Sequence, residues 1–407
     1  MLDDLFARYN PWWEGPYKSP GIRRDRYIAQ IDALVEKRRL VILFGLRRTG
    51  KTYILKQFIA TKLEKIPADR LFFISMDHPA VKAYSIDDII NGYRQRFKLQ
   101  RKEKVYVILD EIQKRDGFEN DLKAVYDLEE NVYIIATGSN SLAIRHKTGD
   151  LSGRHGRIKV NPLSFEEYLI FKGIQTKESE QYLKARYLEE YMSTGGIPDY
   201  VLTGDPQYVV DVVDDIIYKD IAARYDLKDP GLLKDLFYLL CNRVGKKLSH
   251  SKLARIMKLT DDTIRQYMTY FEETFLIQFV EKTGTPNERK YSPKKVYISD
   301  LGILNVFGQD MEKGAKAENL VYLRLKEKGD VSYIDTQKGE VDFLSGGQAI
   351  EVKYKDSISE EELKPIISLK GKNVKSRYVV GKKPGKIDDM PIIGLTEFMS
   401  ADERRDK

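Results

Sequence analysis

The chain contains a single cysteine, Cys241, so no disulfide can form within its 407 residues. This fits the reducing cytoplasm and argues against a zinc site built from thiolates. No stretch approaches the roughly 18 to 20 uncharged apolar residues that a membrane-spanning helix needs. The first ten residues also lack the basic-then-apolar pattern of a secretory signal. We therefore expect a cytoplasmic protein that has no membrane partner.

A strong excess of either charge is missing as well. The 69 basic and 62 acidic residues leave a net charge of +7, which permits nucleic-acid binding without requiring it. Hydrophobic residues make up 42% of the chain, a share that excludes a disordered polypeptide. Because 407 residues exceed what one hydrophobic core usually fills, we expect more than one domain.

A glycine-rich loop follows the apolar run LVILF. Residues 45–52 read GLRRTGKT and lead into YILKQFIA, so the loop joins a buried strand to a helix. Gly45 and Gly50 let the backbone curl so that its N–H groups face a polyphosphate at the helix N-terminus. Lys51 would reach the β- and γ-phosphates, and Thr52 would bind the Mg²⁺ that bridges them. The other loop residues expected to contact the nucleotide are Arg47, Arg48, Thr49 and Tyr53.

Residues 40–160 alternate short apolar runs with helical stretches, which predicts a parallel sheet covered on both faces. The run at 105–109 ends in Asp110 and Glu111, at the sheet edge where ligands bind in open α/β folds. Asp110 suits the binding of Mg²⁺ through water, and Glu111 is positioned to polarise the attacking water. Solvated strand-end charges are the alternative, which the upstream glycine loop disfavours.

Polar residues follow the next apolar run, VYIIATGSNS. Asn140 or Ser139 could sense the γ-phosphate, although each is also an ordinary turn former. Arg154 flanks a glycine-containing turn and could reach a phosphate of this chain or of a neighbouring copy, as an arginine finger does. A solvated surface arginine is the alternative. A finger acting between copies would require a homo-oligomer.

The middle of the chain reads as helical, with a break at the segment GGIP. Between 231 and 300, Ser249 and Asp261 stand at expected helix N-caps, and a strand pair follows, the rhythm of a winged helix. The apolar positions at helical spacing are Leu253, Ile256, Ile264, Tyr267 and Met268. The second helix would present Thr263, Arg265 and Gln266 to DNA. A packing module without DNA contact is the alternative.

A second set of acids lies beyond residue 310. Asp342 falls on the first strand of an expected hairpin, and Glu351 and Lys353 share one face of its second strand. Glu318, on the preceding helix, could converge on them. The three acids can hold Mg²⁺ or Mn²⁺, and Lys353 can orient or deprotonate an attacking water. Glu340 is a second choice as a ligand, and an inactive charged hairpin is the alternative.

The segments NPWW, GLRRTGKT, ILDEIQ, ATGSN, LSGR with PLSF-EEYL, and GGIP together resemble the archaeal branch of AAA-type ATPases related to the STAND group. The resemblance spans nearly the whole chain and implies ATP rather than GTP as the nucleotide. It also implies a helical lid that moves with the nucleotide. Glu318, Asp342, Glu351 and Lys353 are similar to the PD-(D/E)xK nuclease pattern of archaeal Holliday junction resolvases, although Val341 stands where proline is usual.

The expected fold is α/β, with a P-loop NTPase core on a parallel sheet and a C-terminal α/β restriction-endonuclease-like domain. The expected boundaries are 1–160 for the core, 161–230 for the helical lid, 231–300 for the winged helix and 301–407 for the nuclease-like domain. This organisation predicts an ATPase that acts on DNA, in which hydrolysis controls access to a deoxyribonuclease site. The alternative is a nucleotide-dependent switch, in defence or in a mobile element, whose C-terminal domain binds DNA or a partner without cleaving it.

Overall fold

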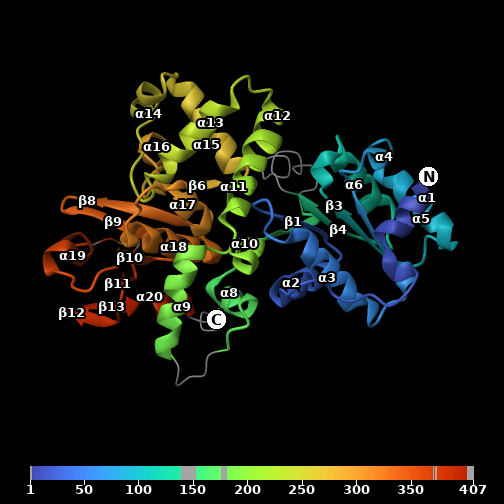
Figure 1. Ribbon diagram of the computed structural model, residues 1–407, viewed down its shortest axis with the longest axis horizontal. Coiled ribbons are helices and arrows are strands. Elements are labelled where there is room, and N and C mark those ends of the chain that lie inside the picture. Colours follow the sequence, from blue (N-terminus) through green and yellow to red (C-terminus); the bar gives the residue numbers. More distant parts are fainter. Residues whose placement is uncertain (1, 139–152, 176–180, 370, 372–373, 401–407) are drawn as a thin grey trace. The chain divides into compact units, whose positions relative to one another are not determined.

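The computed structural model describes residues 2–138, 153–175, 181–369, 371 and 374–400. The chain divides into two compact units, Met1–Asn161 and Pro162–Lys407 (Figure 1).

The first unit is built on a five-stranded sheet in the order β2-β3-β4-β1-β5, in which all neighbours run parallel. Its strands are β1 (Leu40–Phe44), β2 (Leu71–Ser75), β3 (Val105–Asp110), β4 (Val132–Gly138) and β5 (His155–Lys159). Most of their residues are buried, as expected for a parallel sheet with helices on both faces. The structure thus confirms the predicted α/β core with a parallel sheet.

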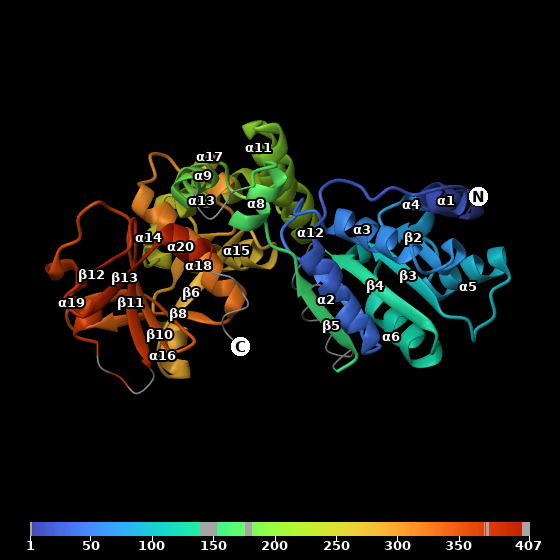
Figure 2. The same ribbon diagram turned by 90° about the horizontal axis from the view of Figure 1, so that it is seen from below.

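Helices cover the two faces of this sheet, as Figure 2 shows. They are α1 (Leu2–Tyr9), α2 (Asp25–Glu36), α3 (Lys51–Leu63), α5 (Ile86–Phe97) and α6 (Phe118–Leu128), with the short α4 (Pro79–Lys82) beside them. Phe6 of α1, Tyr93 of α5 and Leu122 of α6 pack on one face. Ile31 of α2 and Phe58 of α3 pack on the other, so alternate strand residues feed two separate cores.

The NPWW segment protects the free edge of β2. An edge strand leaves backbone groups without strand partners. The Asn10 amide donates to the Phe73 carbonyl oxygen at 2.8 Å, and its oxygen accepts from the Phe73 N–H at 2.6 Å. The indole N–H of Trp12 donates to the Leu71 carbonyl oxygen at 3.0 Å, and Trp13 does so at 3.1 Å. The motif therefore has a structural reason independent of nucleotide.

The second unit begins with helices and continues into a mixed sheet. Its first helical elements are α8 (Phe165–Phe171), α9 (Gln181–Thr194), α10 (Pro198–Thr203), α11 (Pro206–Asp214), the π-helix η6 (Asp215–Ala222), α12 (Ala223–Tyr225) and α13 (Pro230–Cys241). The later helices are α14 (His250–Met257), α15 (Asp261–Glu273), α16 (Pro286–Tyr291), α17 (Leu301–Phe307), α18 (Lys313–Lys328), α19 (Glu360–Ile367) and α20 (Leu395–Ser400).

The GGIP segment lies tightly against the start of α17. Gly195 has φ +77°, and a Cβ there would lie 2.1 Å from the Gly302 nitrogen. The N–H of Gly196 donates to the buried Asp300 carboxylate at 2.6 Å, while the Leu163 N–H donates to the Gly196 carbonyl oxygen at 2.7 Å. The glycines are therefore explained by close approach of two backbones.

The sheet of the second unit has eight strands in the order β12-β13-β11-β10-β9-β8-β6-β7. They are β6 (Ile277–Lys282), β7 (Lys295–Ile298), β8 (Val331–Thr336), β9 (Gly339–Ser345), β10 (Gln348–Lys353), β11 (Ser376–Gly381), β12 (Gly385–Ile387) and β13 (Met390–Gly394). β6 pairs with β8 through Glu281–Ser332 and Lys282–Tyr333. The strand pair expected of a winged helix and the strands expected of a nuclease-like domain therefore share one sheet.

Candidate functional site

The phosphate-binding loop candidate is a tight turn between β1 and α3. Gly45 has φ +145°, and a Cβ there would lie 2.3 Å from the Val160 carbonyl oxygen. Gly50 has φ +87° at the N-cap of α3. Arg48 is also left-handed, with φ +60°. Only glycine fits at position 45, because both its own backbone conformation and the nearby backbone of Val160 exclude a side chain.

Lys51 lies inside this loop. Its ammonium donates to the carbonyl oxygens of Gly45 at 3.1 Å and Leu46 at 2.8 Å. The Thr49 hydroxyl also donates to the Leu46 carbonyl oxygen, at 2.9 Å. These bonds curl the loop around the lysine and fix its position at the start of α3.

Arg24, which precedes α2, supports the loop from outside. It is 4% exposed, and its guanidinium donates to the carbonyl oxygens of Thr49 at 2.8 Å and Asn161 at 3.1 Å. Its backbone N–H donates to Gln57 of α3 at 3.1 Å. Sequence reasoning missed this residue, since it is one of several arginines in GIRRDR and only the tertiary structure distinguishes it.

Asp110, at the end of β3, lies beside the loop. Its carboxylate accepts from the Thr52 hydroxyl at 2.8 Å and from the Thr137 hydroxyl of β4. Burial raises the pKa of Asp110, whereas the Thr137 and Thr52 hydroxyls and the Lys51 charge lower it. Because β4 lies between β1 and β3, Thr137 stands between the two motifs. The structure therefore brings Lys51, Thr52 and Asp110 together.

Glu111 follows in a left-handed conformation, with φ +52°. Its N–H donates to the Thr137 hydroxyl at 3.0 Å, and its carboxylate accepts from the Gln113 amide. Non-glycine residues in this conformation are uncommon and mark places where side-chain direction matters. The turn directs Glu111 away from the path of β3, next to Asp110.

Of the other predicted nucleotide contacts, Arg47 is half-buried in the loop. Tyr53 is 53% exposed and its ring lies against Gly21. Asn140 and Ser139 lie outside the described residues. Arg154 precedes β5, and its carbonyl oxygen accepts from Leu40 at the start of β1. The glycine loop follows the C-terminal end of β1. Arg154 therefore lies beside the N-terminal end of this strand, away from the loop of its own chain.

The second candidate site gathers the predicted acids of the C-terminal region. The Asp342 carboxylate accepts from the Val352 N–H at 3.0 Å, and its own N–H donates to Glu351 at 3.3 Å. Lys353 donates to the Glu351 carboxylate at 2.5 Å. Glu318 of α18 accepts from the Tyr297 hydroxyl at 2.7 Å. The four predicted residues lie on β9, β10 and α18, and the charge of Asp342 acts on both Glu318 and Glu351.

Lys295 of β7 lies among these acids and was not predicted. Its ammonium is 2.5 Å from Glu340, 3.2 Å from Asp342 and 3.4 Å from Glu318, and its side chain is 1% exposed. Although burial lowers the pKa of Lys295, the three carboxylates together raise it well above its usual value. The sequence signal was a lysine at the start of the apolar strand in KKVYISD, which requires a charged partner when it is buried.

Burial raises the pKa of Glu318 and Glu351, and the neighbouring charge of Asp342 raises both further. Within the described ranges, no group of three or more histidine, cysteine, aspartate or glutamate side chains is arranged to hold a metal ion. Glu318, Glu340 and Asp342 are instead joined through the ammonium group of Lys295, while Lys353 contacts Glu351. The chemistry of the donor set suits a divalent cation, but lysines already neutralise it.

The helix pair α14–α15 has the predicted winged-helix sequence features. Ser249 caps α14, while Thr260 rather than Asp261 caps α15. Four of the five predicted apolar positions are buried, but Ile256 is 51% exposed. Thr263 is partly buried, whereas Arg265 and Gln266 of α15 are exposed. The connection between β6 and β7 contains the short helix α16.

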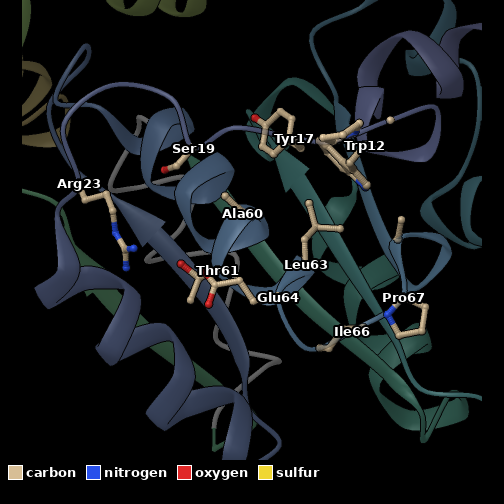
Figure 3. A pocket seen from close by; sticks show the side chains of 13 residues that line it. Trp12, Tyr17, Ser19, Arg23, Ala60, Thr61, Leu63, Glu64, Ile66 and Pro67 are labelled. Carbon is tan, nitrogen blue, oxygen red and sulfur yellow. The ribbon is translucent and has the colours of Figure 1, made fainter.

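A cavity of about 520 Å³ lies elsewhere in the first unit (Figure 3). It lies between the segment that holds Trp12 and Tyr17 and the last turn of α3, near Leu63 and Glu64. The glycine loop is at the other end of this 13-residue helix, roughly 18 Å away. None of the predicted nucleotide contacts lines this cavity.

Comparison with known families agrees with the first site. A family model described as an AAA domain matches residues 37–169, which contain the glycine loop, Asp110 and the five strands. A second model, described as a domain of unknown function, matches residues 185–313. Residues 37–169, which form the parallel sheet, are therefore similar to an AAA domain.

Relatives exist in both archaea and bacteria. An uncharacterized protein of Methanocaldococcus jannaschii is 26% identical over 371 residues, covering 85% of this chain and 81% of that protein. An uncharacterized protein of Haemophilus influenzae is 26% identical over 408 residues, covering 93% and 98%. The predicted restriction to archaea is therefore not supported.

Solved structures overlap the chain only loosely. A Walker-type ATPase of Pyrococcus abyssi covers 75% of this chain and 99% of its own, at 16% identity and a TM-score of 0.47. The ORC1 protein of Aeropyrum pernix, solved in complex with DNA, covers 72% and 94% at 12% identity and a TM-score of 0.33. Overlaps this weak carry no argument about function. Across the part of the chain that the structure describes, no helix is long and apolar enough to cross a membrane.

Proposed function

We propose that the chain is a Mg²⁺-dependent ATPase. The observation that carries this proposal is the hydrogen bond of 2.8 Å between Thr52, beside Lys51, and Asp110. Two oxygen ligands of the kind that Mg²⁺ prefers thus stand next to a loop curled for phosphate. In this proposal the residues that contact ATP are Gly45, Arg47, Arg48, Thr49, Gly50, Lys51, Thr52, Tyr53, Asp110 and Asn140.

The proposed roles follow from position. Mg²⁺, when bound, would offset the negative charge of the phosphates. Thr52 would hold the ion directly, and Asp110 would hold it through water. Glu111 is anchored through its backbone by Thr137, and its carboxylate, which accepts from the Gln113 amide, would orient the attacking water. Arg154 would act as a finger on the nucleotide of a neighbouring copy, because it is remote from its own loop.

The ATPase proposal is tested by Lys51→Ala. Removal of the ammonium from the phosphate site should lower ATP turnover by about 10² to 10³-fold, the range seen when one electrostatic stabiliser is lost. Lys56→Ala, on the same helix but over the Phe73 ring, is the matched control and should turn over ATP normally. Turnover by Lys51→Ala at the wild-type rate would remove the assignment.

We further propose that the protein acts on DNA in the cytoplasm, through the winged-helix region and the C-terminal domain. Three exposed basic residues lie here: Arg255 on α14, Lys258 in the turn that follows, and Arg265 on α15. Asp261 and Asp262 occupy the first turn of α15, so contact with phosphates would involve these basic residues rather than the helix start. Comparing ATP turnover with double-stranded, single-stranded and four-way-junction DNA tests this step.

The same proposal gives the C-terminal cluster a metal-dependent nuclease role. Glu318, Asp342 and Glu351 would hold Mg²⁺ or Mn²⁺, which would polarise the scissile phosphate. Lys353, held 2.5 Å from Glu351, would orient the attacking water. Cleavage of linear or branched DNA in Mn²⁺ should disappear in Asp342→Asn but persist in Asp388→Asn, an acid outside the cluster. If the wild type cuts no DNA with either metal, the nuclease role fails.

A nucleotide-dependent switch is the second candidate function. The observation that favours it is Lys295, whose ammonium neutralises the acids that a nuclease would use for metal. In this case the C-terminal domain would bind DNA or a partner without cleaving it. Slow ATP turnover together with DNA binding, but no cleavage in Mg²⁺ or Mn²⁺, is the expected combination.

The oligomeric state is tested separately. A finger role for Arg154 requires a homo-oligomer, so light scattering in the presence of a non-hydrolysable ATP analogue should detect self-association. Arg154→Ala should lower ATP turnover only where copies associate. If the protein is a monomer and Arg154→Ala keeps full activity, Arg154 has no catalytic role. Its observed contact is then the ion pair of 3.1 Å with Asp127.

A further inference from the structure

The inference concerns Lys295 and rests on the proposed carboxylate site of the C-terminal region. Lys295 comes from β7, a strand outside the hairpin that carries Asp342 and Glu351. Its ammonium is within 3.4 Å of three acids that lie on β9 and α18. The side chain is 1% exposed, so the cluster rather than solvent provides its partners.

We propose that Lys295 is a built-in cation that competes with a divalent metal ion for this carboxylate cluster. A metal ion would need the oxygens of Asp342 and Glu318 that now accept from the lysine. An ammonium among the ligands would also repel a doubly charged ion. Metal can therefore bind there only when the ammonium of Lys295 withdraws, and the wild-type site binds divalent ions weakly.

The place to which Lys295 can withdraw is given by Glu340. Of the three acids, Glu340 makes the shortest contact, 2.5 Å, and is the most exposed at 27%. Its other oxygen is 2.8 Å from Lys247, which also pairs with Asp335. Glu340 thus belongs with the lysines rather than with the metal ligands. It acts as the counter-ion that keeps Lys295 paired when the other two acids bind a metal.

Backbone geometry holds Lys295 at this place. The residue pairs with Val280 across β6–β7, and an isolated bridge joins it to Lys247. Only the side chain can move, because its Cα is fixed by the sheet. Lys353 differs, since its ammonium contacts Glu351 and its side chain is 25% exposed. A lysine in that position can orient water beside a metal, whereas Lys295 stands in the metal's place.

The experiment measures Mn²⁺ binding by calorimetry on the full-length, nucleotide-free protein. All variants carry Asp110→Asn, which removes the carboxylate of the ATP site from the measurement. Lys295→Met keeps the side-chain volume but removes the charge. It should bind one Mn²⁺ about tenfold or more tightly than its parent does, because the competing charge is gone. Adding Asp342→Asn should abolish this gain.

Two variants serve as controls. Lys247→Met removes a lysine that contacts Glu340 but neither Asp342 nor Glu318, and should change Mn²⁺ affinity by no more than about twofold. Lys295→Arg keeps the charge and should show no gain. Lys295→Gln, with unfolding followed by circular dichroism, provides a second neutral variant, and added Mn²⁺ should raise its melting temperature but not that of the parent.

The proposal is overturned if neither neutral variant binds Mn²⁺ more tightly than the parent. It is also overturned if the parent already binds Mn²⁺ tightly and loses it in Asp342→Asn. The nuclease role is judged by DNA cleavage alone. A gain of Mn²⁺ binding without cleavage would therefore support the role of Lys295 and reject the nuclease.

Discussion

The two acidic centres of this protein differ in what surrounds their carboxylates. Asp110, in the first unit, accepts from two hydroxyl groups, those of Thr52 and Thr137. Asp342, in the second unit, accepts from the ammonium of Lys295 and one backbone N–H. Hydroxyls leave the negative charge in place and can themselves bind a metal ion. Ammonium groups cancel the charge and cannot.

Acid type and spacing alone therefore do not define a metal site. Both centres place carboxylates on strands of a sheet, and both were predicted to bind Mg²⁺. In the first centre the carboxylate accepts from neutral hydroxyl donors, and the ammonium of Lys51 donates to carbonyl oxygens of the loop. In the other centre the protein supplies the positive charge itself.

The largest effect is expected for Glu111→Gln, at the centre that contains Asp110. Loss of the general base should lower ATP turnover by about 10² to 10³-fold. ATP binding should remain, because Glu111 does not belong to the loop that holds phosphate. Turnover is measured by phosphate release and binding by a fluorescent analogue, with the exposed Glu130→Gln as control. Equal loss of binding and turnover would show that Glu111 is structural.

The second prediction compares two glycines, one at each centre. Gly45→Ala should cost about 4 kcal/mol of unfolding free energy, because its Cβ would lie 2.3 Å from a backbone oxygen that cannot move. Gly245→Ala has φ +74° and its Cβ would lie 2.7 Å from the Glu318 carboxylate, a side chain that can shift. It should cost about 1 to 2 kcal/mol. Urea unfolding measures both, and equal costs would contradict the contrast.

Much of this arrangement could be predicted from local sequence. The glycine loop, Asp110 and Glu111 were found because a strand, a turn and a helix follow one another directly in the chain. The hairpin acids were found because side chains alternate along strands, which fixes Glu351 and Lys353 on one face. In each case the information lies within about ten residues, and short-range geometry is sufficient.

Residues whose role depends on distant segments were missed. Arg24 supports the glycine loop only because α2 and β5 approach each other in the fold. Lys295 meets Glu318 and Asp342 only because β7 joins the same sheet as β9, which a boundary at residue 300 concealed. Arg154 was considered for the phosphates of its own chain, but strand direction places it at the other edge. The place of Arg154 in the sequence, shortly after the strand that ends in ATG, therefore did not predict its place in the fold.

The third prediction extends the contrast to Asp300, an acid held by neutral backbone donors. It is buried and accepts from the N–H groups of Gly196 and Gly302. Burial raises the pKa of Asp300 from 3.8 to about 6, even though these hydrogen bonds lower it. The folded state therefore binds the proton more tightly than the unfolded state does. Stability should be highest below about pH 4 and should fall as the pH rises to about 6.

Asp300→Asn should remove this part of the pH dependence, which amounts to roughly 3 kcal/mol at most. Urea unfolding between pH 4 and pH 7 measures it, with the exposed Asp310→Asn as control. A variant whose stability falls over this range as steeply as that of the wild type would show that another group titrates there. If the stability of Asp300→Asn does not change over this range, the Asp300 carboxylate is the group that titrates, and its backbone donors do not offset the cost of burying its charge.

The smallest effect is expected for the loss of a single hydroxyl. Thr137→Val removes a donor to Asp110 and an acceptor for the Glu111 N–H, and should cost about 2 kcal/mol of unfolding free energy. Tyr297→Phe removes a donor to Glu318, but Lys295 still serves the same oxygen at 3.4 Å, so the cost should be about 0.5 kcal/mol. If Tyr297→Phe costs as much as Thr137→Val, the lysine does not stabilise Glu318. The charge of the second centre would then have to be neutralised by another group.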